Sequence, residues 1–131
     1  MARQFFNPPD LATPANNMYN HVVKVGSTVY IAGQVSRDLD GKTAYVGDVE
    51  GQVRQVWANL EKAVRAAGGA LGDIVKTTTY VVGAENLGKI RAVRADLLPA
   101  EGRPTSTTLL VVGLADPDLL VEVEAIAVLG D

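Results

Sequence analysis

Two glutamates near the C-terminal end of the chain, Glu122 and Glu124, have the spacing that most clearly could support chemistry. They are two residues apart in a β-rich segment, so both carboxyl groups point to one face of the predicted strand. Neighbouring carboxylates resist joint ionisation, which raises the pKa of one into the working range of a general acid or base. The same spacing is also typical of solvated glutamates or of glutamates paired with arginine, and the sequence leaves both interpretations open.

A second polar group begins at Arg103 and continues through a hydroxyl-rich segment that contains Ser106 and Thr107. One guanidinium followed by hydroxyls could hold a substrate carboxylate through a bidentate pair and neutral hydrogen bonds. An ordinary strand with alternating polar residues is the other interpretation. Tyr19 precedes a predicted strand, where it could line a pocket or pack at the tip of a loop.

Residue counts and missing motifs exclude several common catalytic machineries. The chain has no cysteine, and its one histidine, His21, cannot form a His-rich metal centre. The motifs of P-loops, dinucleotide-binding folds, zinc proteases and serine hydrolases are missing from the sequence. We therefore expect no metal and no organic cofactor, with water as the nucleophile on a small molecule. His21, at the start of a predicted strand, is expected to be a structural or surface histidine rather than a catalytic base.

The elements that must position these residues follow from the hydrophobic periodicity. Strands are predicted at 21–25, 28–32, 73–82, 105–112 and 119–129, the first two as a hairpin around Gly26-Ser27. Apolar residues in steps of three and four predict helices at 48–67 and 85–98. The segment 7–20 is rich in Pro, Asn and Ala and predicts a loop or surface arm. The last two strands look like a closing pair.

This order of elements predicts a single α/β domain over residues 1–131, in which two helices cover one face of a mixed sheet. The other face would leave Ile126 and Val128 in water in a monomer, which indicates that partner subunits cover it. A make-up of 47% apolar and 21% charged residues is typical of one globular domain.

Charge and hydropathy restrict the partners. The formal net charge is −3 and the basic residues form no run, which argues against a nucleic-acid surface. The N-terminus lacks the apolar stretch of a signal peptide, and no apolar run approaches the length of about 20 residues that a membrane helix needs. We expect a cytoplasmic protein without membrane or nucleic-acid partners.

Three separated segments, 30–35 (YIAGQV), 72–81 (GDIVKTTTYV) and 120–128 (LVEVEAIAV), resemble the RidA (YjgF) family in sequence and in order. The resemblance covers nearly the whole chain. It implies a chorismate-mutase-like fold and a homotrimer, whose three sheets form a closed barrel with the helices outside and clefts between subunits. It also implies an enamine/imine deaminase, which hydrolyses reactive enamines and imines to an oxo compound and ammonia without a metal or organic cofactor.

The resemblance implies roles for three residues of this chain. Gly33 matches the loop glycine whose backbone approaches the substrate, and Tyr19 matches the tyrosine of the cleft. Glu122 matches the glutamate that holds or activates water, so it is the expected catalytic residue.

The chain departs from the family pattern at the carboxylate-binding position. The family motif Pro-x-Arg stands here as Pro104-Thr105-Ser106, so Ser106 occupies the place of the arginine. Arg103 is the nearest replacement, but an offset of three residues predicts that its side chain lies on the opposite face of the strand. The usual serine of the hairpin is Ala32 here, which removes another polar contact.

This departure leaves two hypotheses of function. One is a hydrolase that adds water to an imine, an enamine or a related electrophile but takes a non-classical substrate. The alternative is a non-catalytic trimer that binds a small ligand or acts in regulation. Nucleic-acid cleavage ranks third because the chain has no basic stripe. Turnover of an imine generated in situ favours the first, and ligand-induced thermal stabilisation without turnover favours the second.

Overall fold

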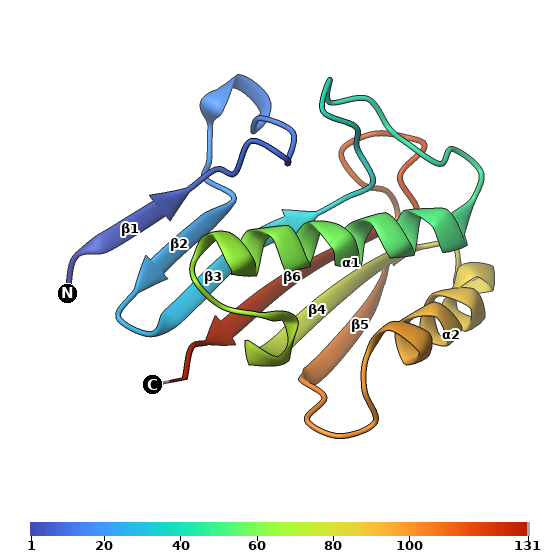
Figure 1. Ribbon diagram of the computed structural model, residues 1–131. Coiled ribbons are helices and arrows are strands. Elements are labelled where there is room, and N and C mark those ends of the chain that lie inside the picture. The colour runs from blue at the N-terminus through green and yellow to red at the C-terminus, as the bar shows by residue number, and fades with distance from the viewer. Residues whose placement is uncertain (131) are drawn as a thin grey trace.

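The computed structural model describes residues 1–130 as one six-stranded mixed sheet with two α-helices on one face (Figure 1). The strands are β1 (Arg3–Phe6), β2 (Val22–Val25), β3 (Thr28–Gln34), β4 (Ile74–Val82), β5 (Thr105–Val111) and β6 (Val121–Val128). The helices are α1 (Val49–Ala66) and α2 (Leu87–Leu97). The predicted hairpin, both predicted helices and the other three predicted strands are all present.

The strands lie in the order β1-β2-β3-β6-β4-β5, and within residues 1–130 the only parallel pair is β4 with β5. The expectation that the last two strands pair with each other is therefore wrong. The chain leaves β4, passes through α2 and returns alongside β4 as β5, which is the connection that a parallel pair requires. β6 then inserts between β3 and β4, where both of its edges find hydrogen-bond partners.

One strand was not predicted. β1 pairs antiparallel with β2 at the edge of the sheet, and three of its four residues are exposed. A strand so short and so exposed carries no hydrophobic alternation from which to predict it. The segment that follows it is irregular, as expected, apart from a short 3-10 turn at Ala15–Asn17.

Helix α1 covers the centre of the sheet because its apolar residues form one continuous stripe. Val53, Val56, Trp57 and Leu60 lie on this stripe and are buried. The Asp48 side chain accepts a hydrogen bond of 3.0 Å from the Gly51 amide and caps the helix N-terminus. Among residues 1–130, no helix is long and apolar enough to cross a membrane.

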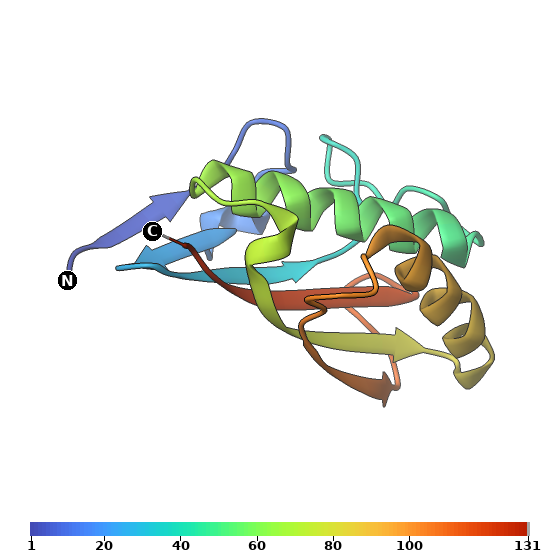
Figure 2. The same cartoon turned by 60° about the horizontal axis from the view of Figure 1, so that its bottom comes forward.

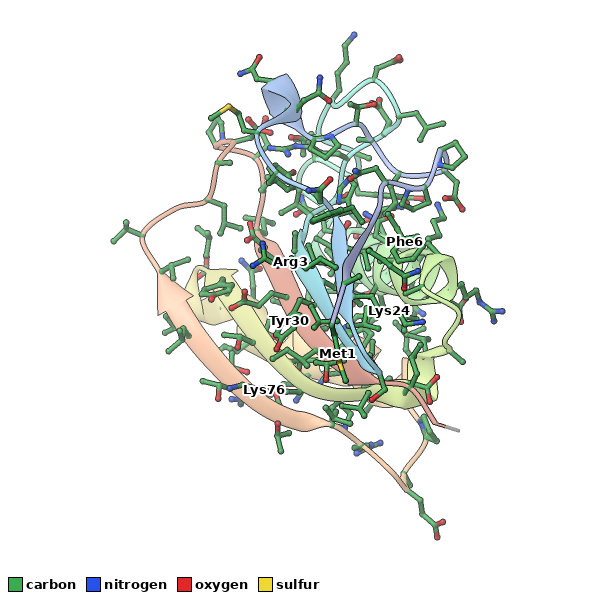
Figure 3. All side chains as sticks on the ribbon, turned by 90° about the vertical axis from the view of Figure 1, so that its left-hand side faces the viewer. Met1, Arg3, Phe6, Lys24, Tyr30 and Lys76 are labelled. Carbon is green, nitrogen blue, oxygen red and sulfur yellow. The ribbon has the colours of Figure 1, made fainter. Side chains whose placement is uncertain are left out.

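The two faces of the sheet differ in cover. Figure 2 shows both helices on the same side, and the β6 residues that face them are buried. In Figure 3, Phe6 and Lys24 lie on the side of α1, whereas Tyr30 and Lys76 lie on the opposite side. We call this opposite side the open face. Tyr30 is 50% exposed and Val128 44% exposed, which agrees with the uncovered face that the sequence predicts.

Candidate functional site

A bulge in β3 brings Gly33 against Glu122. Ile31 pairs with Ala125 and Gln34 with Val123, so β3 contains one more residue than β6 over this stretch. Such bulges redirect the local backbone and are frequent beside active sites. A Cβ atom on Gly33 would overlap Glu122 Oε2 and would lie 2.8 Å from Glu122 Cδ. Because residue 33 has no side chain, the Glu122 carboxyl can occupy this space.

The environment of Glu122 favours its protonated form. Glu122 is partly buried, and burial raises the pKa of its carboxyl above the ordinary value. The neighbouring carboxylate of Glu124 raises this pKa further, while Arg37 acts in the opposite direction. The sequence predicted that one of the two carboxyls would have a raised pKa; the larger cause is burial rather than the second carboxylate. A carboxyl tuned in this way can both accept and return a proton.

Tyr80 holds the second carboxylate. It pairs with Glu122 in the β4–β6 register, and its hydroxyl donates a hydrogen bond of 2.6 Å to Glu124 Oε1. This hydrogen bond raises the pKa of the Tyr80 phenol, and burial and the two carboxylates add to the effect. Glu124 is thus a fixed acceptor beside Glu122, and the two glutamates have different environments on one face.

Arg37 is held near Glu122 by an acid from the loop before β6. Its Nη2 and Nε atoms donate to Asp116 Oδ2 at 2.9 and 3.2 Å. No sequence pattern indicates Arg37 as a site residue, because its ion pair with Asp116 joins loops that are far apart in the chain. Strand pairing, by contrast, could have indicated Tyr80, since the predicted strands around it have a defined alternation.

Tyr19 and His21 lie on the other side of the β3 bulge. Tyr19 and Gly33 both line a pocket of about 30 Å³, which is large enough for one water molecule. His21 is buried and donates from Nε2 to the Ala12 carbonyl at 2.6 Å, while its Nδ1 lies 3.1 Å from Gln34 Nε2. Both ring nitrogens are thus engaged inside the chain, as expected for a structural histidine.

Ser106 and Arg103 lie elsewhere, at the edge of the sheet beneath α2. Both line a pocket of about 320 Å³, so the expectation that Arg103 faces away from Ser106 is wrong. The alternation argument failed because β5 begins after Arg103, whose Nε atom instead donates to the Pro99 carbonyl at 2.8 Å. The Ser106 hydroxyl accepts a hydrogen bond of 2.9 Å from Arg94 Nη1, a residue that the sequence analysis also did not identify.

Within one chain, the predicted site residues therefore form separate groups. Gly33 and Glu122 touch, and Tyr19 lies beside Gly33. Ser106 pairs with the buried Thr77 and shares its helix-covered face. Thr107 pairs with Thr78 and lies on the open face instead. In the part of the chain that the structure describes, no group of three His, Asp or Glu side chains is placed to hold a metal ion.

The open face carries a hollow beside Glu124. A depression of about 410 Å³ is lined by residues of β2, β3, β4 and β6. Glu124 and Lys76 supply its charged groups, and Tyr30 and Ile126 supply apolar surface. Its mixed lining suits a small polar molecule or the surface of another protein chain.

Sequence comparison assigns the family. The profile of the family described as endoribonuclease L-PSP matches residues 10–129. A RutC family protein of Pyrococcus horikoshii is 35% identical over 111 residues, which are 83% of this chain and 85% of that protein. The chain belongs to this family, the RidA (YjgF) family.

Solved structures of RidA-family proteins share the fold of the whole chain. A Rid-family protein of unknown function from Yersinia pestis, YyfA, is 28% identical with a TM-score of 0.89, over 98% of this chain and 100% of that one. Escherichia coli TdcF, solved with bound serine, is also 28% identical, with a TM-score of 0.86 over 97% and 99% of the two chains. The RidA resemblance and the mixed α/β fold expected from the sequence are thereby confirmed.

Proposed function

We propose that this RidA-family protein hydrolyses a reactive imine, or the enamine that tautomerises to it, to an oxo compound and ammonia. The observation that carries the proposal is the partly buried Glu122 carboxyl, which is fixed against Gly33 and has a raised pKa. General acid–base catalysis needs a group whose pKa lies near the working pH. In this site, Glu122 is the side chain whose pKa burial raises toward neutral pH.

The proposed reaction uses water and one carboxyl group. The Glu122 carboxylate takes a proton from water while the oxygen attacks the carbon of the C=N bond. The tetrahedral carbinolamine then forms, and its nitrogen takes up a proton from the Glu122 carboxyl. The hydroxyl proton of the carbinolamine then passes through the Glu122 carboxylate to the amine nitrogen. The C–N bond breaks, the C=O group forms, ammonia leaves, and Glu122 is again a carboxylate. One water is consumed and no electrons are exchanged, so neither a redox cofactor nor a metal ion is required by the balance.

Gly33 and Glu124 have supporting roles in this proposal. The absence of a side chain at Gly33 leaves the carboxyl of Glu122 in contact with the backbone of the bulge, where a small substrate could lie. Glu124 accepts a hydrogen bond from the Tyr80 hydroxyl, and its charge adds to burial in raising the pKa of Glu122. Tyr19, beside Gly33, is proposed to border the substrate.

We further propose that the working form is a homotrimer with its sites between subunits. The open face exposes Tyr30 and Val128, and the partly buried Ile126 lines its hollow; burial of such apolar surface in another subunit is favourable. The bound serine of the TdcF structure shows that a relative of the same fold holds a small amino acid. A small molecule with a carbon–nitrogen bond is therefore a reasonable ligand class for this chain.

Two imine sources test the activity. An amine oxidase supplies imines without a carboxylate, and an amino-acid oxidase supplies 2-imino acids. The release of oxo compound is followed with and without the protein, and Glu122→Gln provides the matched variant. We expect wild-type protein to accelerate hydrolysis of at least one class and Glu122→Gln to lose about 100-fold or more of the rate. Equal rates with wild type and with Glu122→Gln would contradict the proposal.

The departure at Ser106 supports one alternative function. At position 106, β5 has a neutral serine hydroxyl, which already accepts a hydrogen bond from Arg94. A 2-imino acid would therefore not meet at this position the arginine that other RidA-family proteins have. A trimer that binds a small ligand without converting it is then the second candidate. Imine or oxo-acid analogues that raise the melting temperature, without any turnover, would favour it.

A further inference from the structure

Two amide side chains of α1 are buried among the apolar residues that the helix packs against the sheet. Gln52 is 0% exposed and Asn59 is 5% exposed. They are seven residues apart, which is two helical turns, so both leave the same face of α1, about 10 Å apart along its axis. A buried amide is costly unless its polar atoms are hydrogen-bonded. The hydrogen bonds of these two side chains therefore show what the helix holds in place.

Gln52 binds the segment that leads into β6. Its Oε1 atom accepts a hydrogen bond of 2.9 Å from the Leu120 amide, and its Nε2 atom donates to the Asp118 carbonyl, also at 2.9 Å. Leu120 precedes Glu122 by two residues. One side chain thus fixes, at two points, the backbone immediately before the proposed catalytic residue.

Asn59 binds the corresponding point of β3. Its Nδ2 atom donates to the Val35 carbonyl at 3.0 Å, and its Oδ1 atom accepts a hydrogen bond of 2.8 Å from Gln55 Nε2. Val35 follows Gly33 by two residues. Because β3 and β6 are antiparallel, the end of β3 and the start of β6 lie at the same edge of the sheet. Helix α1 therefore binds both segments, each two residues away from the contact between Gly33 and Glu122.

A third contact of Gln52 fixes the loop between β3 and α1. Its Nε2 atom also donates to the Tyr45 carbonyl at 3.2 Å. Tyr45 has a φ of 58°, in the left-handed region that disfavours residues with a side chain, and its ring lies against Gly51. The same loop contains Arg37, whose charge acts on Glu122. The Gln52 amide thus joins this loop to the start of β6.

We propose that Gln52 and Asn59 are positioning residues, which hold the backbones of β3 and β6 so that the Glu122 carboxyl stays against Gly33. Both act through the backbone, and neither is a catalytic residue. Precise placement matters because a displacement of about 1 Å can cost a factor of about 100 in rate. The inference rests on the proposed function for its effect on rate, whereas the ionisation of Glu122 can be measured without turnover.

Three variants test the proposal. Gln52→Met keeps the length of the side chain and removes its hydrogen bonds. Asn59→Ala removes the bond to Val35; Asn59 lines a hollow of about 460 Å³, so water can reach the freed carbonyl and we expect the fold to persist. Val64→Ala is the matched control, because Val64 is buried on the same helix, twelve residues beyond Gln52.

The first readout is the ionisation of Glu122, followed by NMR of its carboxyl carbon as the pH changes. Burial is the largest cause of its raised pKa, so a displaced carboxyl should titrate closer to the ordinary glutamate value in both amide variants. The other titratable groups that act on it or on its neighbour are Glu124, Tyr80 and Arg37, and all three remain in every variant. Val64→Ala should leave this titration unchanged.

The second readout is the rate of imine hydrolysis, at a temperature where all variants are folded. We expect the rate to fall by about tenfold or more in Gln52→Met and Asn59→Ala, and the pH profile to move in the same direction as the Glu122 titration. Val64→Ala removes buried apolar surface, so it should lower the melting temperature while rate and pH profile stay those of wild type.

Two results in folded variants would overturn the proposal. One is a Glu122 titration at or above the wild-type pKa in both amide variants. The other is an equal shift in Val64→Ala, which would mean that the effect follows stability alone. If Gln52→Met does not fold, Asn59→Ala carries the same expectation, and unfolding of both would assign the amides to general stability and reject a positioning role. Wild-type protein without imine turnover would contradict the hydrolase, while the titration of Glu122 would still decide on positioning.

Discussion

The carboxyl group of Glu122 occupies the space into which a side chain at Gly33 would project. Glu122 Cδ lies 2.8 Å from the ideal position of a Cβ atom on residue 33, and Glu122 Cγ lies 3.0 Å from it. The two positions lie on neighbouring strands, β3 and β6, and the bulge in β3 determines their approach. The identity of one residue therefore restricts the position of the other.

Gly33→Ala is expected to reduce activity more than stability. The methyl group would push aside the far end of a flexible side chain, so the fold can adapt by moving the Glu122 carboxyl. We expect imine hydrolysis to fall by about tenfold or more, since small displacements of a catalytic group cost large factors in rate. Gly72→Ala is the control, because a Cβ there has no heavy atom within 4 Å. A crystal structure of Gly33→Ala with Glu122 unmoved would contradict this account.

Stability should depend on pH through Glu122. Its pKa in the folded protein is raised, so the folded state holds this proton more tightly than the unfolded state. The stabilisation is therefore complete below the ordinary glutamate pKa of about 4.3 and is lost as the pH rises through the folded pKa. Glu122→Gln should raise the melting temperature at pH 7, with a difference that shrinks toward pH 4. Glu101→Gln, in an exposed loop, is the control and should show no such trend.

The oligomeric state can be tested on the open face. Light scattering of wild-type protein should give about three times the chain mass of 13.8 kDa. Ile126→Lys places a charge on the apolar surface and should release monomers, because an unpaired charge in an interface is costly. Leu39→Lys, at a loop residue that is 65% exposed, should leave the mass unchanged. A wild-type monomer at all concentrations would disprove both the trimer and a site between subunits.

Charge at position 106 should affect stability in opposite directions. Ser106→Arg brings another guanidinium beside Arg94, whereas Ser106→Glu supplies a carboxylate in the same place. We expect the arginine variant to be less stable and the glutamate variant more stable, each by about 0.5 kcal/mol, as is typical of exposed ion pairs. Both shifts should shrink in high salt, because salt screens exposed charges. Equal melting temperatures for the two variants at low salt would contradict the charge distribution of this pocket.

The sequence predicted most of the fold because its long elements carry strong periodic patterns. The stripe that contains Val53, Val56 and Leu60 predicted α1, and the alternation of β6 predicted which of its residues face the core. β1 carries too few apolar residues to show a pattern. The order of the strands also lay beyond the sequence patterns, since periodicity describes a strand's two faces but not its neighbours along the sheet.

The site could be predicted only in part. The spacing of Glu122 and Glu124 placed both carboxyls on one face, as the structure shows. The bulge that brings Gly33 to Glu122 is a matter of register, and Arg37 reaches the site through an ion pair between distant loops. Arg94 meets Ser106 only because α2 packs beside β5. The catalytic role of Glu122 and the binding roles of Tyr19, Gly33, Arg103, Ser106 and Thr107 stay predictions.

The position of β6 has a consequence for how the chain acquires its structure during synthesis. β3 and β4 do not pair with each other, and a strand that follows both of them in the chain, Val121–Val128, joins them. Until it leaves the ribosome, the nascent chain holds two incomplete sheet fragments, β1-β2-β3 and β4-β5, each with an unpaired inner edge. The pairing of β6 with β3 closes a loop of about a hundred residues, the kind of distant contact that slows folding. The sheet therefore stays divided until residues 121–128 are available, and the strand edges exposed until then are the ones that a chaperone would recognise.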